Sequence, residues 1–466
     1  MGAAGRFQRG DPILVLVIVL GWHGSFAESG MSDELATLFT LSSPASNRTE
    51  PKPGKPRIAE PQRAQGEVRF EMPDDMLPPS HTARILWNIL GTLNLTAFGA
   101  QSGSTEGKAG RSLKSPRMML TLWLYAIIGG IGSAREIARR IRTDVVYRWI
   151  VGDLQVGHHK LSEFRVGYGE ALNTLMTDVL ASLMEKGLLD ICLVAQDGTR
   201  TRAAATAPSF RTYGSLLQCR AQAALHLKAV LASAGDPEHT KAQHARQEAA
   251  ARDFQKRVEA AITTVQELQN QRKPTAEPAR ASTTDAEART MKMGDGGYRP
   301  AFNVQYVVAG TGMGGPRTIV GVQVTSSGSD LGSLTPMAEQ VEQRTGVLPK
   351  VVLADGGHVK FDDIISMEAK GIKVLVPPAD NAKSIEQMKL EGAAPELIAW
   401  RERMETQEAK EAYRARASLC EWANAHQKFH HGLAQLVVRG IPKVICVILM
   451  STIASNLMQH AAHWLA

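Results

Sequence analysis

Two short apolar runs that each end in Asp-Gly constrain the fold of this chain most. The first reads ICLVAQDG (residues 191–198) and the second reads KVVLADGG (residues 350–357). Runs of apolar and β-branched residues of this length, closed by a turn dipeptide, predict strands that are buried on both faces. Such a sheet needs helices to cover it, so we expect an α/β protein.

Further strands and helices lie between and after these two runs. FNVQYVVAG (302–310) and TIVGVQVTSS (318–327) alternate around a Gly/Pro-rich turn, which predicts a β-hairpin. KVLVPP (373–378) predicts another buried strand, and the stretches 332–344 and 360–370 have a helical pattern. A hairpin that leads into alternating helices and strands predicts a mixed, partly parallel sheet.

An insertion is expected within this α/β domain, which we place at 190–466. Residues 216–271 are Ala-rich, charged and poor in glycine, which predicts one or two long helices. The Pro/Ser/Thr-rich segment 272–290 is expected to be a flexible tether back to the sheet. Residues 442–458 form an apolar stretch shorter than a membrane span, which favours a buried core helix.

The segment 68–189 has a helical pattern throughout. Ser133 followed by Glu136 is a capping signature that starts one helix, and two more short helices are expected around 144–151 and 159–165. Basic residues are spread over these three helices: Arg135, Arg139, Arg140, Arg142, Arg148, Lys160 and Arg165. This pattern is compatible with an all-α, helix-turn-helix-like DNA-binding domain, and equally with a small helical bundle that has a basic surface.

The first 67 residues read as an extension with a Pro-rich linker. Arg6 and Arg9 precede the apolar run 13–20, and Ser25-Phe26-Ala27 follows, as in a secretory signal. The run is too short for a membrane anchor. The alternative is that translation starts at Met31 and that residues 1–30 have no function as a signal.

Composition is compatible with a nucleic-acid partner without requiring one. The 466 residues are 44% hydrophobic and 21% charged, with a formal net charge of +7, which excludes a wholly disordered or polytopic membrane chain. The four cysteines form no CxxC pair, so neither a disulfide framework nor a zinc site is expected.

Two aspartates and one glutamate are the candidate site residues. Asp197 and Asp355 follow their strands directly, and the carboxyl ends of strands are where ligands bind in open α/β sheets, although Asp-Gly is also a common turn dipeptide. In an expected helix at 402–431, Arg414 and Lys428 each lie one heptad from Glu421. That face suits a metal ion beside a phosphate, but charges at this spacing also occur on solvated helices.

The collinear order of these motifs resembles the DDE transposases of bacterial insertion sequences. Their last catalytic helix carries a Tyr-x2-Arg-x3-Glu-x6-Lys signature, and here Tyr413-x2-Arg416 and Glu421-x6-Lys428 fit it. Four residues rather than three separate Arg416 from Glu421, which makes Arg414 a competing candidate. The resemblance extends over about residues 68–460 and implies an RNase H-like mixed sheet with a helical insertion.

The resemblance implies a metal-dependent enzyme that cuts the ends of its own element and joins the 3′ ends to target DNA. Asp197, Asp355 and Glu421 would hold two Mg²⁺ or Mn²⁺ ions, since carboxylates are the preferred ligands of these cations. Lys428, Arg416, Arg414 and Tyr413 would contact DNA phosphates. The partners implied are double-stranded DNA, at the element ends and the target, and a second copy of the chain in the DNA complex. The insertion would be a DNA-holding or dimerisation arm, or a spacer.

Two other readings remain open at this point. The chain could be a decayed or domesticated DNA-binding protein without catalysis, or an RNase H-like nuclease that acts on other nucleic acids. An enzyme that needs chromosomal DNA has no use for export, so a cytoplasmic, nucleoid-associated location, no membrane partner and a start at Met31 are expected.

Overall fold

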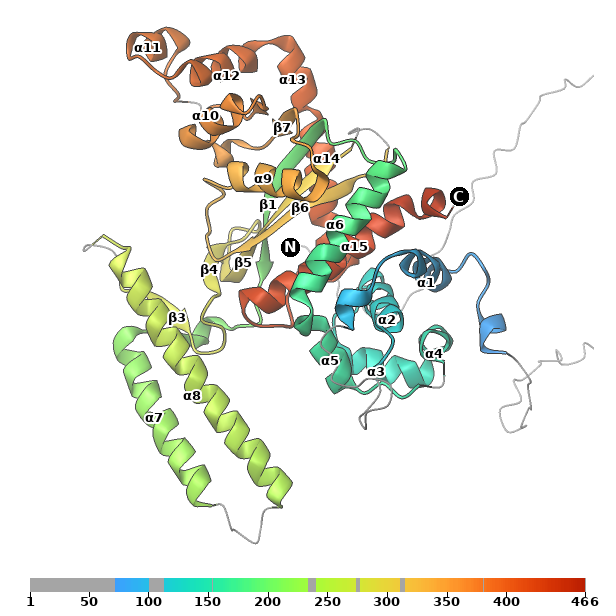
Figure 1. Ribbon diagram of the computed structural model, residues 1–466. Helices are drawn as coiled ribbons and strands as arrows, with labels where there is room; N and C mark the ends of the chain where they lie inside the picture. Colours follow the sequence, from blue (N-terminus) through green and yellow to red (C-terminus); the bar gives the residue numbers. More distant parts are fainter. Residues whose placement is uncertain are drawn as a thin grey trace, which may run out of the picture. The chain divides into compact units, whose positions relative to one another are not determined.

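The computed structural model describes residues 72–99, 113–152, 154–233, 240–273, 277–310, 315–379 and 381–465 (Figure 1). Contacts divide the chain into two units, Met1–Val68 and Arg69–Ala466. All described residues belong to the second unit. The signal-like segment, the alternative start at Met31 and the Pro-rich linker lie outside the described residues.

Helices make up the N-terminal part of the described chain. Ser133 starts the helix at Ala134–Thr143 as predicted, because its side chain accepts a hydrogen bond from the Glu136 backbone N–H at 3.4 Å. Trp123 has no exposed surface, and its Nε1 donates to the Leu161 carbonyl at 3.1 Å. The elements are η1 (Pro73–Met76), α1 (Thr82–Thr92), η2 (Thr96–Phe98), α2 (Pro116–Ile128), α3 (Ala134–Thr143), α4 (Val145–Val151), α5 (His158–Gly167) and α6 (Gly169–Glu185).

The sheet is mixed and partly parallel, as predicted. Strand β1 (Leu193–Arg202) is central: it pairs antiparallel with β5 (Tyr298–Ala309) and parallel with β7 (Val351–Leu353). Strand β8 (Lys373–Leu375) pairs parallel with β7. On the other side, β6 (Thr318–Thr325) and β4 (Arg289–Lys292) pair antiparallel with different parts of β5.

The free edge of β6 is covered by two amide side chains. Asn456, on α15 (Ile441–Trp464), accepts from the Ile319 N–H at 2.9 Å and donates to the Ile319 carbonyl at 2.8 Å. Gln340, on α9 (Leu334–Thr345), makes the same pair of bonds with Val322 at 2.7 and 3.0 Å. Both helices are thereby fixed to the outer strand of the sheet.

Helix α15 is a core helix, as predicted. Among the described residues it alone has the length and apolar composition of a membrane span, and 72% of its most apolar window is buried inside the protein. It packs against β6 and also against α2, α5 and α6. The segments 68–189 and 190–466 therefore share one continuous hydrophobic core rather than forming two separate ones.

The insertion is a pair of long helices with a small core of its own. Helices α7 (Tyr213–Ala232) and α8 (Lys241–Asn270) pack together around Leu216, Val258 and Val265 (Figure 1). At their base, β2 (Phe210–Thr212), preceded by η3 (Ala207–Ser209), pairs antiparallel with β3 (Arg280–Ser282).

The flexible tether expected at 272–290 is therefore wrong for its second half. Ala281 has no exposed surface, and the Ser282 side chain accepts from the Thr284 and Asp285 backbone N–H groups. The strand pair satisfies the backbone where the chain enters and leaves the insertion. Small polar residues fill the narrow space there, and in sequence the same residues are typical of a linker.

The single helix expected at 402–431 is also wrong. It is interrupted at Thr406, which has an extended backbone and whose side chain accepts from the Ala409 N–H, so that a new helix begins there. A second interruption falls at Arg414. The elements of this region are η4 (Gly356–His358), α10 (Phe361–Ala369), α11 (Ile385–Leu390), α12 (Pro395–Glu405), α13 (Gln407–Tyr413), α14 (Ala415–Ala425) and the π-helical turn η5 (His426–His430).

Candidate active site

Asp197 and Asp355 come together through the pairing of β1 with β7. Ala195 pairs with Leu353 in parallel register, and each aspartate lies two residues further along its own segment. Arg416, on α14, joins them: its Nη2 is 3.3 Å from Asp197 Oδ1 and 3.5 Å from Asp355 Oδ2. One guanidinium thus bridges two carboxylates that are 158 positions apart in the sequence.

Burial and neighbouring charge act differently on the two aspartates. The Asp197 side chain is 18% exposed; its burial raises the pKa of this carboxyl, and the positive charge of Arg416 opposes that rise. The Asp355 side chain is 42% exposed, and its hydrogen bond with His358 lowers its pKa. Burial, with the negative charge of Asp197, raises the pKa of the Cys420 thiol on α14. The site therefore holds two carboxylates in different environments.

Helix α14 presents Arg416 and Asn424 to the aspartates, but not Glu421. Asn424 Nδ2 donates to Asp197 Oδ2 at 3.0 Å, whereas Glu421 is exposed. The cause is helix geometry: five residues at 100° each place Glu421 about 140° around the helix from Arg416. The extra residue in the spacing therefore turns Glu421 away from the face that Arg416 occupies.

The other residues expected to contact phosphate lie at different depths. Arg414 is exposed at the start of α14, so Arg416 rather than Arg414 reaches the aspartates. Burial raises the pKa of Tyr413, and the charge of Arg416 opposes the rise. Burial lowers the pKa of Lys428, and the negative charge of Asp197 opposes that change. Tyr413 and Lys428 thus lie within electrostatic reach of the site.

The oxygen atoms at this site are of the kind that binds a hard divalent cation, but a third carboxylate beside Asp197 and Asp355 is lacking among the described residues. Within the described residues, no three His, Cys, Asp or Glu side chains converge as a metal site. The buried Asn424 Oδ1 has no hydrogen-bond partner among the described residues and adds an amide oxygen beside Asp197. Two carboxylates and an amide oxygen are ligands that Mg²⁺ accepts. The guanidinium of Arg416 already places positive charge between the carboxylates.

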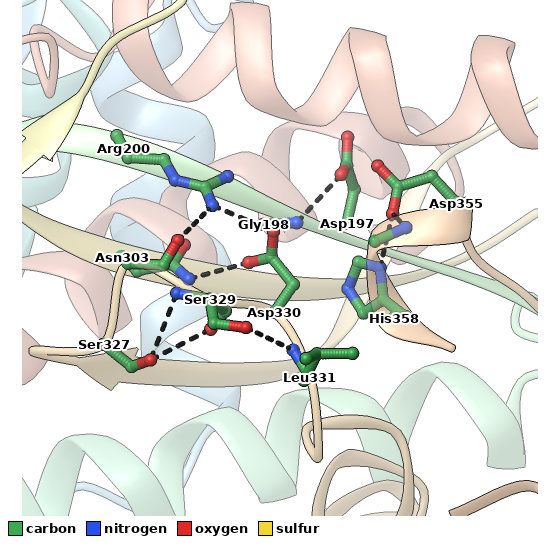
Figure 2. Close-up of polar contacts among 12 residues, drawn as sticks. Asp197, Gly198, Arg200, Asn303, Ser327, Ser329, Asp330, Leu331, Asp355 and His358 are labelled. Atoms are coloured by element: carbon green, nitrogen blue, oxygen red, sulfur yellow. Dashed lines mark hydrogen bonds and ion pairs between the residues drawn. The ribbon is translucent and has the colours of Figure 1, made fainter. Parts of the chain in front are cut away.

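A further carboxylate, Asp330, lies on the face of β1 opposite to the Asp197 side chain and was missed from the sequence (Figure 2). Its side chain is 11% exposed and accepts from Arg200 Nη2 at 3.0 Å, Asn303 Nδ2 at 2.7 Å and Gln305 Nε2 at 2.6 Å. In sequence, Asp330 belongs to a Gly/Ser-rich loop and reads as a turn residue. The available signal was the pair Asn303 and Gln305, two polar residues on one face of a buried strand.

The basic residues of the helical part do not form one free surface. Arg139 and Arg140 both bind Glu136, at 2.6 and 2.9 Å, and these hydrogen bonds lower the pKa of Glu136 to about 2. Lys160 pairs with Glu163 at 2.7 Å, and Arg135 is exposed.

Arg165 is wrong as a DNA-facing residue. It is 8% exposed, lies 5.1 Å from the centre of the Trp123 ring and donates to the Gly132 carbonyl. A guanidinium can pack on an aromatic face inside the protein, so a basic residue in a helical pattern is not necessarily on the surface.

Two stretches of the chain match models of known protein families. Residues 71–166 match a model described as a transposase domain (DUF772), and residues 381–461 match a model described as a transposase DDE domain. The second match includes Arg416, Glu421, Asn424 and Lys428. No curated protein and no protein of solved structure matches the chain.

Proposed function

The chain belongs to the DDE transposases of insertion sequences, and from this premise we propose that it cuts the ends of its own element and joins the 3′ ends to target DNA. One observation carries the proposal: the pairing of β1 with β7 brings Asp197 and Asp355 to the same guanidinium group, that of Arg416. Carboxylates fixed side by side in this way are suited to holding divalent metal for phosphoryl transfer.

In this proposal Asp197 and Asp355 would hold the Mg²⁺ or Mn²⁺ ions. When bound, two such ions stabilise the attacking and the leaving oxygen of an in-line displacement. Arg416 and Lys428 contact the phosphate at the cleavage point, where fixed cations orient the strand and offset its charge. Tyr413 supports Arg416 from the adjoining turn, and Arg414 contacts the strand further out.

Glu421 is the proposed third carboxylate, and Asn424 is its competitor. The spacing Glu421-x6-Lys428 supports Glu421, and the bond from Asn424 to Asp197 supports Asn424. Glu421→Gln and Asn424→Ala distinguish them. The variant that lacks the metal ligand should cut DNA about 100-fold or more slowly than wild type, and the other variant should keep most of its cleavage activity. Equal, full activity of both variants would remove α14 from the metal site.

The rest of the molecule is assigned accordingly. The helical part at 68–189 would bind the element ends through a helix-turn-helix-like unit, with α3 and its exposed Arg135 nearest the DNA, and the mixed sheet would be RNase H-like. The paired helices α7 and α8 would form an arm for DNA or for the second copy of a homodimer. The protein would act at the nucleoid in the cytoplasm.

The test uses the full chain, a linear DNA fragment that bears the element ends, and Mg²⁺. Wild-type protein should cut only at those ends, and Asp355→Asn should abolish cutting while a gel-shift assay shows unchanged end binding. Asp362→Asn is the matched control, because this side chain is 86% exposed and lies nearby on α10. Cutting by Asp355→Asn would contradict the proposal. Cuts away from the ends would support a nuclease instead, and end binding without cuts a regulator.

A further inference from the structure

We propose that His358 and Gln305 are positioning residues for Asp355, anchored by Asp330 behind the sheet. The inference rests on the proposed function, because it assigns a role to groups that do not themselves touch DNA or metal. These residues keep one carboxylate in a single orientation through three successive contacts, of which Figure 2 shows the first, between Asp355 and His358.

The first contact holds one oxygen of Asp355 and leaves the other facing the site. Asp355 Oδ1 is 2.7 Å from His358 Nδ1 and also accepts from the Gly357 N–H at 3.0 Å. Oδ2 is the atom that faces Arg416. The side chain therefore cannot rotate without losing two bonds, and one oxygen always points into the site.

The second contact fixes the ring. His358 has no exposed surface, and its Nε2 is 3.2 Å from Gln305 Oε1. The same oxygen accepts from Gln196 Nε2 at 3.2 Å. Each ring nitrogen thus lies within hydrogen-bond distance of a side-chain oxygen, Nδ1 of Asp355 and Nε2 of Gln305. A ring that is enclosed and occupied at both nitrogens is not a metal ligand itself, which leaves orientation of Asp355 as its role.

The third contact decides which way the Gln305 amide points. Its Nε2 lies 2.6 Å from Asp330 Oδ1, and an ionised carboxylate only accepts hydrogen bonds. The amide nitrogen must therefore face Asp330, which turns the carbonyl oxygen towards His358. Asp330 is itself held by Arg200 and Asn303. The orientation of Asp355 thus depends on a carboxylate on the other face of β1.

The test measures Mn²⁺ binding by electron paramagnetic resonance in the full chain, with cleavage as a second readout. His358→Leu should weaken Mn²⁺ binding about 10- to 100-fold, which is the usual effect of removing a partner that orients a metal ligand. His358→Asn should stay within about threefold of wild type, because its amide nitrogen can replace Nδ1. Gln305→Met should weaken binding in the same direction but less. Gel-shift binding to the element ends should be unchanged in all three.

Each outcome decides the matter. A folded His358→Leu protein with wild-type Mn²⁺ affinity overturns the inference. If that variant does not fold, His358→Asn is compared with His358→Gln, which places its amide nitrogen at the Nε2 position instead of the Nδ1 position. Equal Mn²⁺ affinities of these two variants would overturn the inference. Wild-type protein that neither binds Mn²⁺ nor cuts DNA would be a failure of the proposed function, whereas wild-type binding with indifferent variants is a failure of this inference alone.

Discussion

Replacing Gly198 by alanine adds only one methyl group but should destabilise the protein substantially. Gly198 lies on β1 directly after Asp197, opposite Gln305 in the sheet. A Cβ at this position would lie far inside van der Waals contact with Gln305 Nε2 and Asp330 Oδ1, and 3.0 Å from Asp330 Cγ. Both groups would have to move, and they are the two ends of one hydrogen bond of 2.6 Å.

The magnitude follows from what that movement breaks. Hydrogen bonds to a charged group contribute about 1.5–3 kcal/mol each, and Asp330 Oδ1 also accepts from Asn303. Overpacking by one carbon costs about 1–3 kcal/mol on its own. Since part of the network can shift, we expect Gly198→Ala to lower the free energy of unfolding by about 3 kcal/mol.

Equilibrium unfolding in urea, followed by tryptophan fluorescence, measures this change. Gly214→Ala is the matched control, because nothing lies within 4 Å of a Cβ at this position in the first turn of α7. A Gly198→Ala protein within about 0.5 kcal/mol of wild type would refute the argument that Asp330 and Gln305 fill the space beside this glycine.

Three further predictions concern other parts of the described chain. His431 is buried, and burial lowers its pKa to about 3, so the unfolded chain takes up a proton at this residue before the folded protein does as pH falls. The free energy of unfolding should therefore drop by up to about 1.4 kcal/mol per pH unit between about pH 6.5 and 3. His431→Gln should reduce this pH dependence, whereas parallel slopes for variant and wild type would contradict the prediction. Arg165→Met should lower the free energy of unfolding in urea by about 2 kcal/mol, because the Gly132 carbonyl loses its hydrogen-bond donor. The control Arg135→Met, at an exposed position, should change it by less than about 0.5 kcal/mol. A larger effect at Arg135 than at Arg165 would contradict the buried position of Arg165. Val258→Ala should destabilise the α7–α8 pair by about 2 kcal/mol and speed hydrogen exchange in these two helices but not in β1. Leu225→Ala is the control and should change neither, because the Leu225 side chain is 69% exposed. Faster exchange in β1 of the Val258→Ala variant would mean that the insertion has no independent core.

The strands and the two aspartates could be predicted from the sequence because their signals are local. An apolar run that ends in Asp-Gly indicates a strand with a carboxylate beside it. The expected position after the strand holds for Asp355, beyond β7, but is wrong for Asp197, because β1 continues through Asp-Gly to Arg202. Parallel pairing of β1 with β7 then brings Asp197 beside Asp355. The hairpin was equally accessible, since alternation and a turn are contained within one short segment.

The parts of the site that were missed depend on angles and on distant contacts. The position of Glu421 depends on where α14 begins, and Thr406 and Arg414 divide a stretch whose composition is helical throughout. Asp330 meets Arg200 across 130 positions, and a loop sequence carries no trace of such a partner. Asn424 reaches Asp197 across 227 positions, in the same way.

The amide groups of Asn456 and Gln340 have a consequence for assembly. An outer strand with free backbone groups is a template on which another chain can add a strand, and proteins that gather at high local concentration are exposed to that hazard. Here Ile319 and Val322 already have partners that imitate a neighbouring strand. If two copies meet on DNA as proposed, the edge of β6 at Ile319 and Val322 is therefore closed to strand-to-strand pairing between them.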